Sequence, residues 1–169
     1  MATDLMYGMN VVNILSPAAD LTSNIAISEH VDLVGALDCE FLVHFGVVST
    51  SAGTSSDDTF DLGVFLSATA SSAAGTQVPF TYRSSGLIGT NTWTTWAAST
   101  VALALTSDAT GKIYLVHIDP VEAAGVLASG RYAYLSVEPP DCDNSSIIVG
   151  MAAIVSPRHR QETHRSTTV

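Results

Sequence analysis

The residues of this chain that could do chemistry are few and scattered. The histidines at positions 30, 44 and 117 are far apart in the sequence, and a metal site needs several ligands brought together. His44 and His117 both fall in expected strands and could meet across a sheet. A histidine satisfied within its own sheet is the more common arrangement, so we predict no metal site there.

Two groups of oxygen-rich side chains follow loops, a pattern that can hold calcium. They are Asp57, Asp58 and Asp61, and Asp141, Asp143 and Asn144. Neither group has the alternating Asp pattern with a closing Glu, so we interpret them as solvated turn residues. GxSxG, HExxH, CxxC and phosphate-loop motifs are absent from the sequence. We therefore predict a protein that is not an enzyme and uses no cofactor, with a metal-dependent hydrolase as the least favoured alternative.

The most individual stretch of the sequence spans residues 80–96, FTYRSSGLIGTNTWTTW. Its pattern predicts a strand over residues 80–83, a turn rich in Ser and Gly, and a second strand around residues 92–96. Because alternate side chains of an extended chain point to opposite faces, Arg83 is expected on the face opposite to that of Tyr82.

Two roles are open to this stretch. The simpler role is that of a hairpin that seals one end of the core, since buried Trp and Tyr usually are packing residues. The more specific role is that of an exposed patch of Trp93 and Arg83 that docks on a partner, since these residue types are enriched at interface hot spots. We predict a core role for Phe80 and Tyr82. Arg83 is one of three basic residues up to Pro157, which makes it a candidate for an acidic partner within the sheet or on a neighbouring subunit.

Short segments with alternating hydrophobic residues position these side chains, and alternation is the pattern of β-strands. We predict strands at residues 11–16, in two pieces of 24–37 broken near 28–30, and at 38–48, 60–70, 80–83, 92–96, 101–105, 112–118, 132–138 and 145–155. The segment 38–48 alternates most clearly, with Cys39, Phe41, Val43 and Phe45 on the face expected to be buried. In 112–118 both faces are mostly apolar, which is typical of an interior strand.

Only one short helix is predicted, near residues 120–128. Asp119 can cap it, Pro120 suits its first position, and Glu122 has the capping-box spacing. About eight to ten short strands without repeating strand–helix units predict an all-β fold, an antiparallel β-sandwich of jelly-roll type. We expect a single domain at residues 11–157, an N-terminal arm at 1–10 and a basic tail at 158–169.

Composition limits the classes of function. Of the 169 residues, 47% are hydrophobic and only 13% are charged, about half the usual charged share. Residues up to Pro157 carry 15 acidic and 3 basic side chains, a net charge of −12, whereas the tail carries 3 basic residues and Glu162. Phosphate binding needs clustered Lys and Arg, so we expect no direct nucleic-acid binding by the body. A surface of small neutral residues suits close lateral packing in an assembly.

Cysteine usage and hydropathy add two further expectations. Cys39 and Cys142 are isolated thiols unless their strands meet, which the sequence leaves open. No signal peptide is visible at the start of the sequence. No window approaches the roughly 18 apolar residues of a membrane helix, so we expect no membrane contact.

Several segments resemble small structural proteins of tailed bacteriophages. They are Phe80-Thr-Tyr-Arg83 with the following Gly89-Thr-Asn-Thr-Trp93, the upstream Glu40-Phe-Leu-Val-His-Phe-Gly46, and the ending Val149-Gly-Met-Ala-Ala-Ile-Val-Ser-Pro-Arg158. The resemblance extends from about residue 10 to residue 158. The proteins that the chain resembles include head decoration, or cement, proteins. Its motifs are structural, and it transfers no binding residues to this chain.

The resemblance implies a structural virion protein, made in the host cytoplasm, that decorates and cements the outside of a phage capsid. Its partners would be the major capsid protein and copies of itself, as a dimer or trimer. Candidate interface residues are Tyr7, Arg83, Trp93, Arg158 and Arg160. The alternative is a receptor- or carbohydrate-binding β module of a virion fibre or tail. A major shell subunit is disfavoured, because the common shell fold contains long helices.

Overall fold

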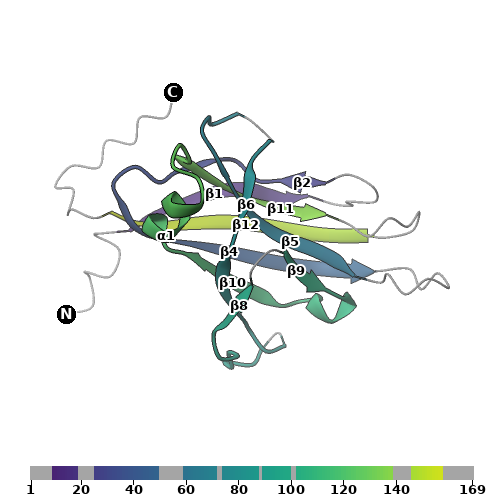
Figure 1. Ribbon diagram of the computed structural model, residues 1–169. Coiled ribbons are helices and arrows are strands. Elements are labelled where there is room, and N and C mark those ends of the chain that lie inside the picture. Colours follow the sequence, from purple (N-terminus) through teal and green to yellow (C-terminus); the bar gives the residue numbers. More distant parts are fainter. Residues whose placement is uncertain are drawn as a thin grey trace.

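Two antiparallel sheets make up most of the molecule (Figure 1). The computed structural model describes residues 9–18, 25–49, 59–71, 74–87, 89–99, 102–138 and 146–157. Within these ranges the chain forms β-strands, one short α-helix and one 3₁₀ turn. The all-β sandwich predicted from the sequence is therefore confirmed.

We call the two layers sheet A and sheet B. Sheet A consists of β1 (Asn10–Ala18), β12 (Ser146–Pro157), β4 (Ala36–Ser49), β10 (Ile113–Ile118), β7 (Phe80–Ser84) and β8 (Ala97–Ser99), in that order. Sheet B has the order β2 (Ala26–Ile27), β11 (Tyr132–Glu138), β5 (Phe60–Ser67) and β6 (Thr76–Val78). In addition, β3 (Val31–Asp32) pairs with β11, and β9 (Ala102–Leu105) pairs with β5.

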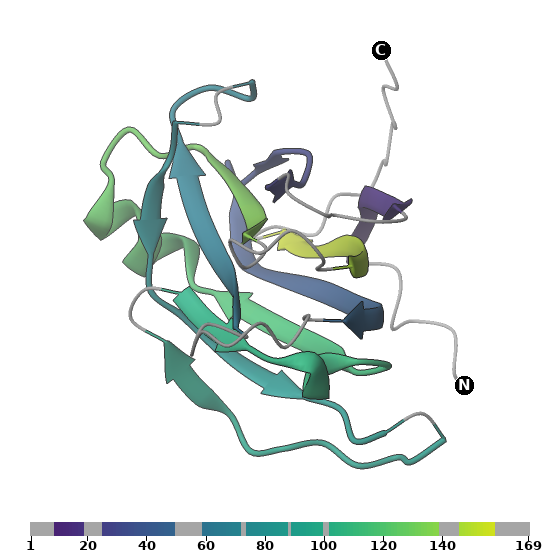
Figure 2. The ribbon, with the colours of Figure 1, turned by 90° about the vertical axis from the view of Figure 1, so that its right-hand side faces the viewer.

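Eight of the strands pair in the nested order of a jelly roll. The outermost pair along the chain is β1 with β12, followed inward by β2 with β11, β4 with β10, and β5 with β6. Strands β7 and β8 extend sheet A beyond β10. The hairpin that carries Arg83 is thus an addition to the jelly roll, and its turn projects from the body (Figure 2).

The core lies between the sheets and follows the predicted alternation. On β4, the side chains of Cys39, Phe41, Val43 and Phe45 are fully buried, as predicted. Residues of β5 and β11 complete the core from the other layer. Burial of each large apolar side chain contributes about 1.5–3 kcal/mol. Strand β10 lies between β4 and β7, which confirms its predicted interior position.

The predicted second strand around residues 92–96 is wrong. The hydroxyl of Thr94 accepts the Ser84 N–H at 2.9 Å, where a regular ladder would use a backbone carbonyl. Trp93 makes only an isolated bridge, to Ser85. Regular pairing resumes at Ala97, so the returning strand β8 begins one residue beyond the predicted segment.

The helix α1 (Pro120–Val126) forms as predicted, although it ends two residues early. The carboxylate of Asp119 caps it by accepting the N–H groups of Val121 at 2.7 Å and Glu122 at 3.4 Å. The chain leaves the helix through a turn in which the Gly130 N–H donates to the Leu127 carbonyl at 2.8 Å. No helix in the described ranges has the length and apolarity needed to span a membrane.

Candidate functional site

Strand β7 presents its side chains to two different environments. Phe80 is buried in the core and Tyr82 packs against it, as the sequence predicts. Thr81 and Arg83 occupy the alternate positions and therefore point to the outer face of sheet A. On the neighbouring strand β10, Leu115 lies directly opposite Arg83.

The guanidinium of Arg83 contacts two indole rings. Its central carbon lies 4.9 Å from the ring centroid of Trp93 and 4.8 Å from that of Trp96. Both distances are within the range of a cation–π interaction. The two rings remain 41% and 46% exposed. We call these three residues the Arg–Trp cluster.

The cluster borders a buried apolar residue on the outer face. Leu115 is only 7% exposed, yet it does not belong to the core between the sheets. Its cross-strand neighbours are Arg83 on one side and Leu42 on the other. Its burial therefore comes from the outer layer of side chains, to which both neighbours belong.

One donor of the cluster has no acceptor. The Nε atom of Arg83 is buried without a hydrogen-bond partner, an arrangement that costs about 1–3 kcal/mol. The ion pairs formed among the described residues are His117 with Asp38 and Arg131 with Asp32. The acidic partner predicted for Arg83 is thus not found within the described part of the sheet.

The turn before Trp93 is shaped by two glycines. Gly89 has φ +85°, a conformation that other residues rarely adopt. A Cβ at Gly86 would collide with the hydroxyls of Thr90 and Thr92. The Gly86 N–H donates to the Thr92 carbonyl at 2.8 Å. This hydrogen bond closes the turn and fixes the position of the next residue, Trp93.

A row of three polar side chains borders the cluster. His117 lies with its Nε2 atom 2.6 Å from Asp38 Oδ1 and its Nδ1 atom 3.3 Å from Thr81 Oγ1. The two atoms of the contact with Asp38 are close, but they are poorly aligned, and Asp38 Oδ1 accepts no hydrogen bond. The imidazole ring meets Trp96 edge to face at 6.1 Å.

The order hydroxyl, imidazole, carboxylate is also that of a hydrolase triad. Here the distance from Thr81 to His117 is long, and the contact from His117 to Asp38 is poorly aligned. We therefore assign the row to holding the His117 ring against Trp96.

The other predicted chemical groups are placed as follows. His44 lies opposite Ile113, whereas His117 lies opposite Glu40, so the two histidines do not meet across the sheet. Cys39 is a buried free thiol, and burial raises its pKa to about 12, helped by the carboxylates of Asp38 and Glu40. Within the described ranges no three His, Cys, Asp or Glu side chains gather to hold a metal ion.

Several predicted residues lie outside the described ranges. They are the interface candidates Tyr7, Arg158 and Arg160, the acidic residues Asp57, Asp58, Asp141 and Asp143 with Asn144, and Cys142. Of the predicted interface residues, the structure places Arg83 and Trp93, and it brings them together. It adds Trp96, which the sequence prediction placed in a strand of the same hairpin without naming it as a contact.

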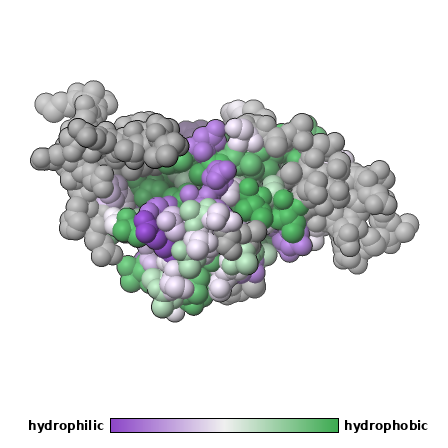
Figure 3. All heavy atoms as spheres, turned by 90° about the horizontal axis from the view of Figure 1, so that it is seen from above, coloured by the Kyte–Doolittle hydropathy of each residue, from purple (hydrophilic) through white to green (hydrophobic). Residues whose placement is uncertain are grey.

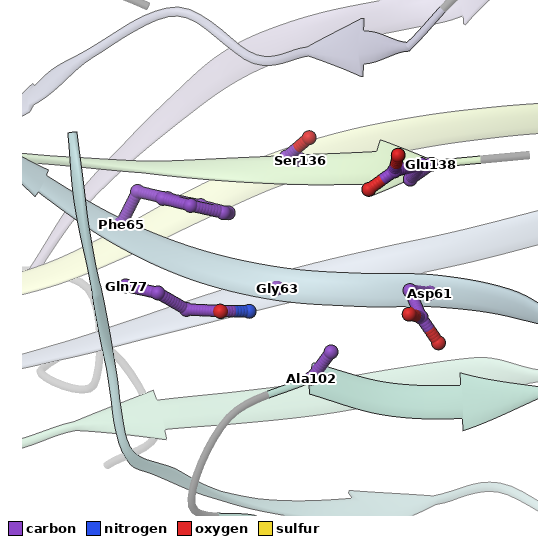
Figure 4. Close-up of a pocket in the computed structure, with 7 residues that line it drawn as sticks. All are labelled: Asp61, Gly63, Phe65, Gln77, Ala102, Ser136 and Glu138. Atoms are coloured by element: carbon purple, nitrogen blue, oxygen red, sulfur yellow. The ribbon is translucent and has the colours of Figure 1, made fainter. Parts of the chain in front are cut away.

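A second feature, a groove of about 400 Å³, lies on the outer face of sheet B. It sits where β5 passes from pairing with β9 to pairing with β6. Gly63 lies at its centre, and a Cβ there would come within 2.9 Å of both Gln77 and Phe65. In Figure 4 these two side chains flank Gly63, while Asp61 and Glu138 lie toward the other end of the groove.

The two carboxylates of the groove stand directly opposite each other on adjacent strands, Asp61 on β5 and Glu138 on β11. Like charges in this position repel, and neither forms an ion pair with a described residue. The sequence prediction placed Asp61 in an acidic loop group and did not connect it with Glu138. Only the register of β5 against β11 shows that they are neighbours.

Comparison with known proteins adds no relative. No protein-family model matches the chain, and no curated protein matches its sequence significantly.

Proposed function

We propose that the chain is a structural virion protein that decorates the outside of a phage head and binds the capsid through the Arg–Trp cluster. The observation that carries the proposal is the pair of half-exposed indoles around an arginine whose Nε has no acceptor. Trp and Arg are the residue types most enriched at interface hot spots. Their burial by a capsid subunit would remove apolar ring surface from water and offer the guanidinium an acidic partner.

The position of the cluster supports this proposal. It lies on β7 and the turn before β8, which are additions to the eight strands of the jelly roll. Jelly rolls occur in viral capsid proteins and in lectins. Because one fold serves many functions, the fold is compatible with the proposal, and the added hairpin gives it a specific surface.

The mechanism of stabilisation would be mass action. A protein that binds only where capsid subunits are assembled lowers the free energy of the assembled state. The low charge content and the small neutral side chains of the surface favour such close packing. Copies bound side by side and the major capsid protein would be the partners.

The test is addition of the purified full chain to heads that lack it. The wild-type chain should bind, and it should raise the temperature at which the heads release DNA. Arg83→Ala should weaken binding by about thirtyfold, the loss expected for a hot spot of about 2 kcal/mol. Val121→Ala is the matched control, because Val121 is 62% exposed on α1 and is not a member of the cluster.

Two results would count against the proposal. One is a chain that does not bind bare heads, and the other is an Arg83→Ala variant that binds as well as the wild type. Urea unfolding of each free variant separates a loss of binding from a loss of fold.

A second candidate function is a carbohydrate-binding module, which the groove on sheet B favours. Its Asp61 and Glu138 carboxylates could accept hydrogen bonds from sugar hydroxyls, and the Gln77 amide can both donate and accept. Phe65 supplies an aromatic wall. A glycan array with the full chain is the test; specific hits that disappear in Gln77→Ala support this function, and a blank array rejects it.

A further inference from the structure

The longest exposed sheet edge in the described structure is β1. It is nine residues long, and none of the described strands pairs with its outer side. The other edge strands described are short: β9 has four residues, β8 and β6 have three each, and β2 and β3 have two each. Short edge strands are a common protection against unwanted pairing, so β1 is the edge that lacks this protection.

Half of β1 is protected in another way. The pairing of β1 with β12 is irregular between Asn13 and Leu15 and again between Leu15 and Ala18, and Pro17 has no N–H to donate. Bulges and proline both discourage a further strand from pairing. Residues 10–13 pair regularly with β12 and carry neither device. The unprotected part of the edge is therefore this short regular segment.

The same edge is apolar, and its regular part is uncharged. The exposed Glu29, whose N–H donates to the Ile14 carbonyl at 2.8 Å, lies beyond this regular part. Met9, Val11 and Val12 are exposed along it, and Ile25 and Ile27 are exposed on the adjacent edge of sheet B. Residues 9–18 and 25–28 contain no charged side chain, although the body as a whole carries a net charge of −12. Figure 3 shows the molecule from above, with apolar residues in green and hydrophilic residues in purple intermixed between the grey segments.

We propose that β1 pairs antiparallel with β1 of a second copy of this chain, so that two A sheets join across a two-fold axis. A second copy fits because the backbone donors and acceptors of a free strand edge match those of its own copy in antiparallel pairing. Two bodies of charge −12 repel each other over most of their surface, and a neutral edge is where they can approach without opposing like charges. A two-fold axis uses the same patch on both partners, which an uncharged strand edge satisfies. This inference does not depend on the proposed capsid function.

The symmetry fixes which residues meet. The two-fold axis is perpendicular to the plane of the joined sheet, so each side chain stays on the same face in both copies. The residue nearest the axis therefore stands opposite the same residue of the second copy. Within the regular segment the central residues are Val11 and Val12. Opposite residues of an antiparallel pair have Cα atoms about 4.5–5.5 Å apart, which a disulfide can span.

The first test is the oligomeric state of the full chain by sedimentation equilibrium, from about 1 µM to about 500 µM. We expect a dimer whose dissociation constant rises at least about tenfold in Val11→Lys, since this change places like charges together at the axis. Val11 is 59% exposed, so the lysine does not disturb the core. Val121→Lys, at a similarly exposed position, should dimerise like the wild type.

The second test is cross-linking in a Cys142→Ser background. Cys39 can stay, because it is buried and its raised pKa makes it a poor nucleophile. Val11→Cys or Val12→Cys should form an intermolecular disulfide under mild oxidation, and Val121→Cys should not. Failure of both β1 variants to cross-link would overturn the proposal.

Two further outcomes would overturn it. One is a wild-type chain that stays monomeric at every concentration. This holds even if removal of residues 1–8 then produces a dimer, because that result would mean that the chain's own arm occupies the edge in the full chain. The other is a Val11→Lys variant that dimerises as strongly as the wild type. Added salt should strengthen the dimer by screening the repulsion between the two acidic bodies.

Discussion

In the described structure, the outer face of each sheet buries one large hydrophobic side chain outside the core, but the two faces do so in opposite ways. On sheet B, Tyr134 is 1% exposed; it stacks on Phe65 at 5.4 Å and contacts His30 at 4.6 Å. Its hydroxyl accepts the Gly75 N–H at 3.0 Å. On sheet A, Leu115 is buried beneath a layer whose aromatic rings stay half exposed and whose arginine keeps an unpaired donor.

This difference separates a structural layer from a binding layer. Around Tyr134 the aromatic surface is covered and the polar atom has its partner, so nothing further is gained by contact with another molecule. Around Arg83 ring surface is left exposed, and one buried donor has no partner. Aromatic content alone therefore does not mark an interface, whereas incomplete burial and an unmet donor do.

The largest expected effect is the loss of the sheet B layer. Tyr134→Ala should lower the free energy of unfolding by about 3–5 kcal/mol, because it removes a fully buried ring and leaves a cavity. Urea unfolding followed by circular dichroism measures this. Tyr132→Ala, at a half-buried position on the same strand, is the control and should cost clearly less. A cost below about 1 kcal/mol for Tyr134→Ala would erase the distinction between the two faces.

A smaller effect is expected from crowding the same layer. A Cβ on Gly75 would lie 2.6 Å from the Tyr134 hydroxyl and 2.9 Å from the Leu66 carbonyl, so Gly75→Ala should destabilise the fold by about 1–3 kcal/mol. Gly125→Ala is the matched control, since no atom lies within 4 Å of the added carbon in α1. The control should gain up to about 1 kcal/mol from better helix propensity. Equal unfolding midpoints for the two variants would contradict the described packing around Tyr134.

The indoles of sheet A should matter little for folding. Trp93→Ala and Trp96→Ala are each expected to lower the free energy of unfolding by about 1 kcal/mol or less, the size of an exposed cation–π contact. Binding to heads should fall much further in both variants. If instead each costs as much stability as Tyr134→Ala, the Arg–Trp cluster belongs to the fold and its role in docking is rejected.

The smallest effect concerns the other exposed arginine, which has the partner that Arg83 lacks. The hydrogen bonds from Arg131 hold the pKa of Asp32 below its ordinary value of 3.8, against the opposing effect of burial. A lowered pKa means that the pair stabilises the fold above pH 3.8, and that this contribution disappears as the pH falls through the lower pKa of the folded state.

Asp32→Asn should therefore lose a small amount of stability at neutral pH and little more on acidification. The difference in unfolding midpoint between wild type and variant should shrink below about pH 4. Acid titrations of both proteins in urea measure it. A difference that stays constant with pH would show that the pair does not act through ionised Asp32.

The sequence predicted those features that depend on local pattern. Alternation placed Phe41 and Phe45 in the core, because both faces of β4 follow from residue spacing alone. The cap at Asp119 was readable for the same reason, since its partners are two and three residues away.

Features that depend on register could not be predicted. Alternation places Leu115 and Tyr134 on one face of their strands without showing that this face is the outer one, and only distant strands explain why both are buried there. The pairing of Asp61 with Glu138 is of the same kind. Within the candidate site, the alternation of residues along the strand predicted that Tyr82 and Arg83 lie on opposite faces of the sheet. The contact of Arg83 with Trp96 required knowing that Thr94 interrupts the ladder.

The central strand β4 also constrains how the chain reaches this fold. Its long partner β12 is the last strand of the described chain, and their pairing runs from Ser49 with Ser146 to Ala36 with Pro157. Sheet A therefore cannot close until nearly all of the chain has been synthesised, and its contacts are overwhelmingly between distant residues. Such topologies fold slowly and leave apolar strands exposed meanwhile. A chain shortened within β12 should fail to fold, even though every residue of the Arg–Trp cluster would still be present.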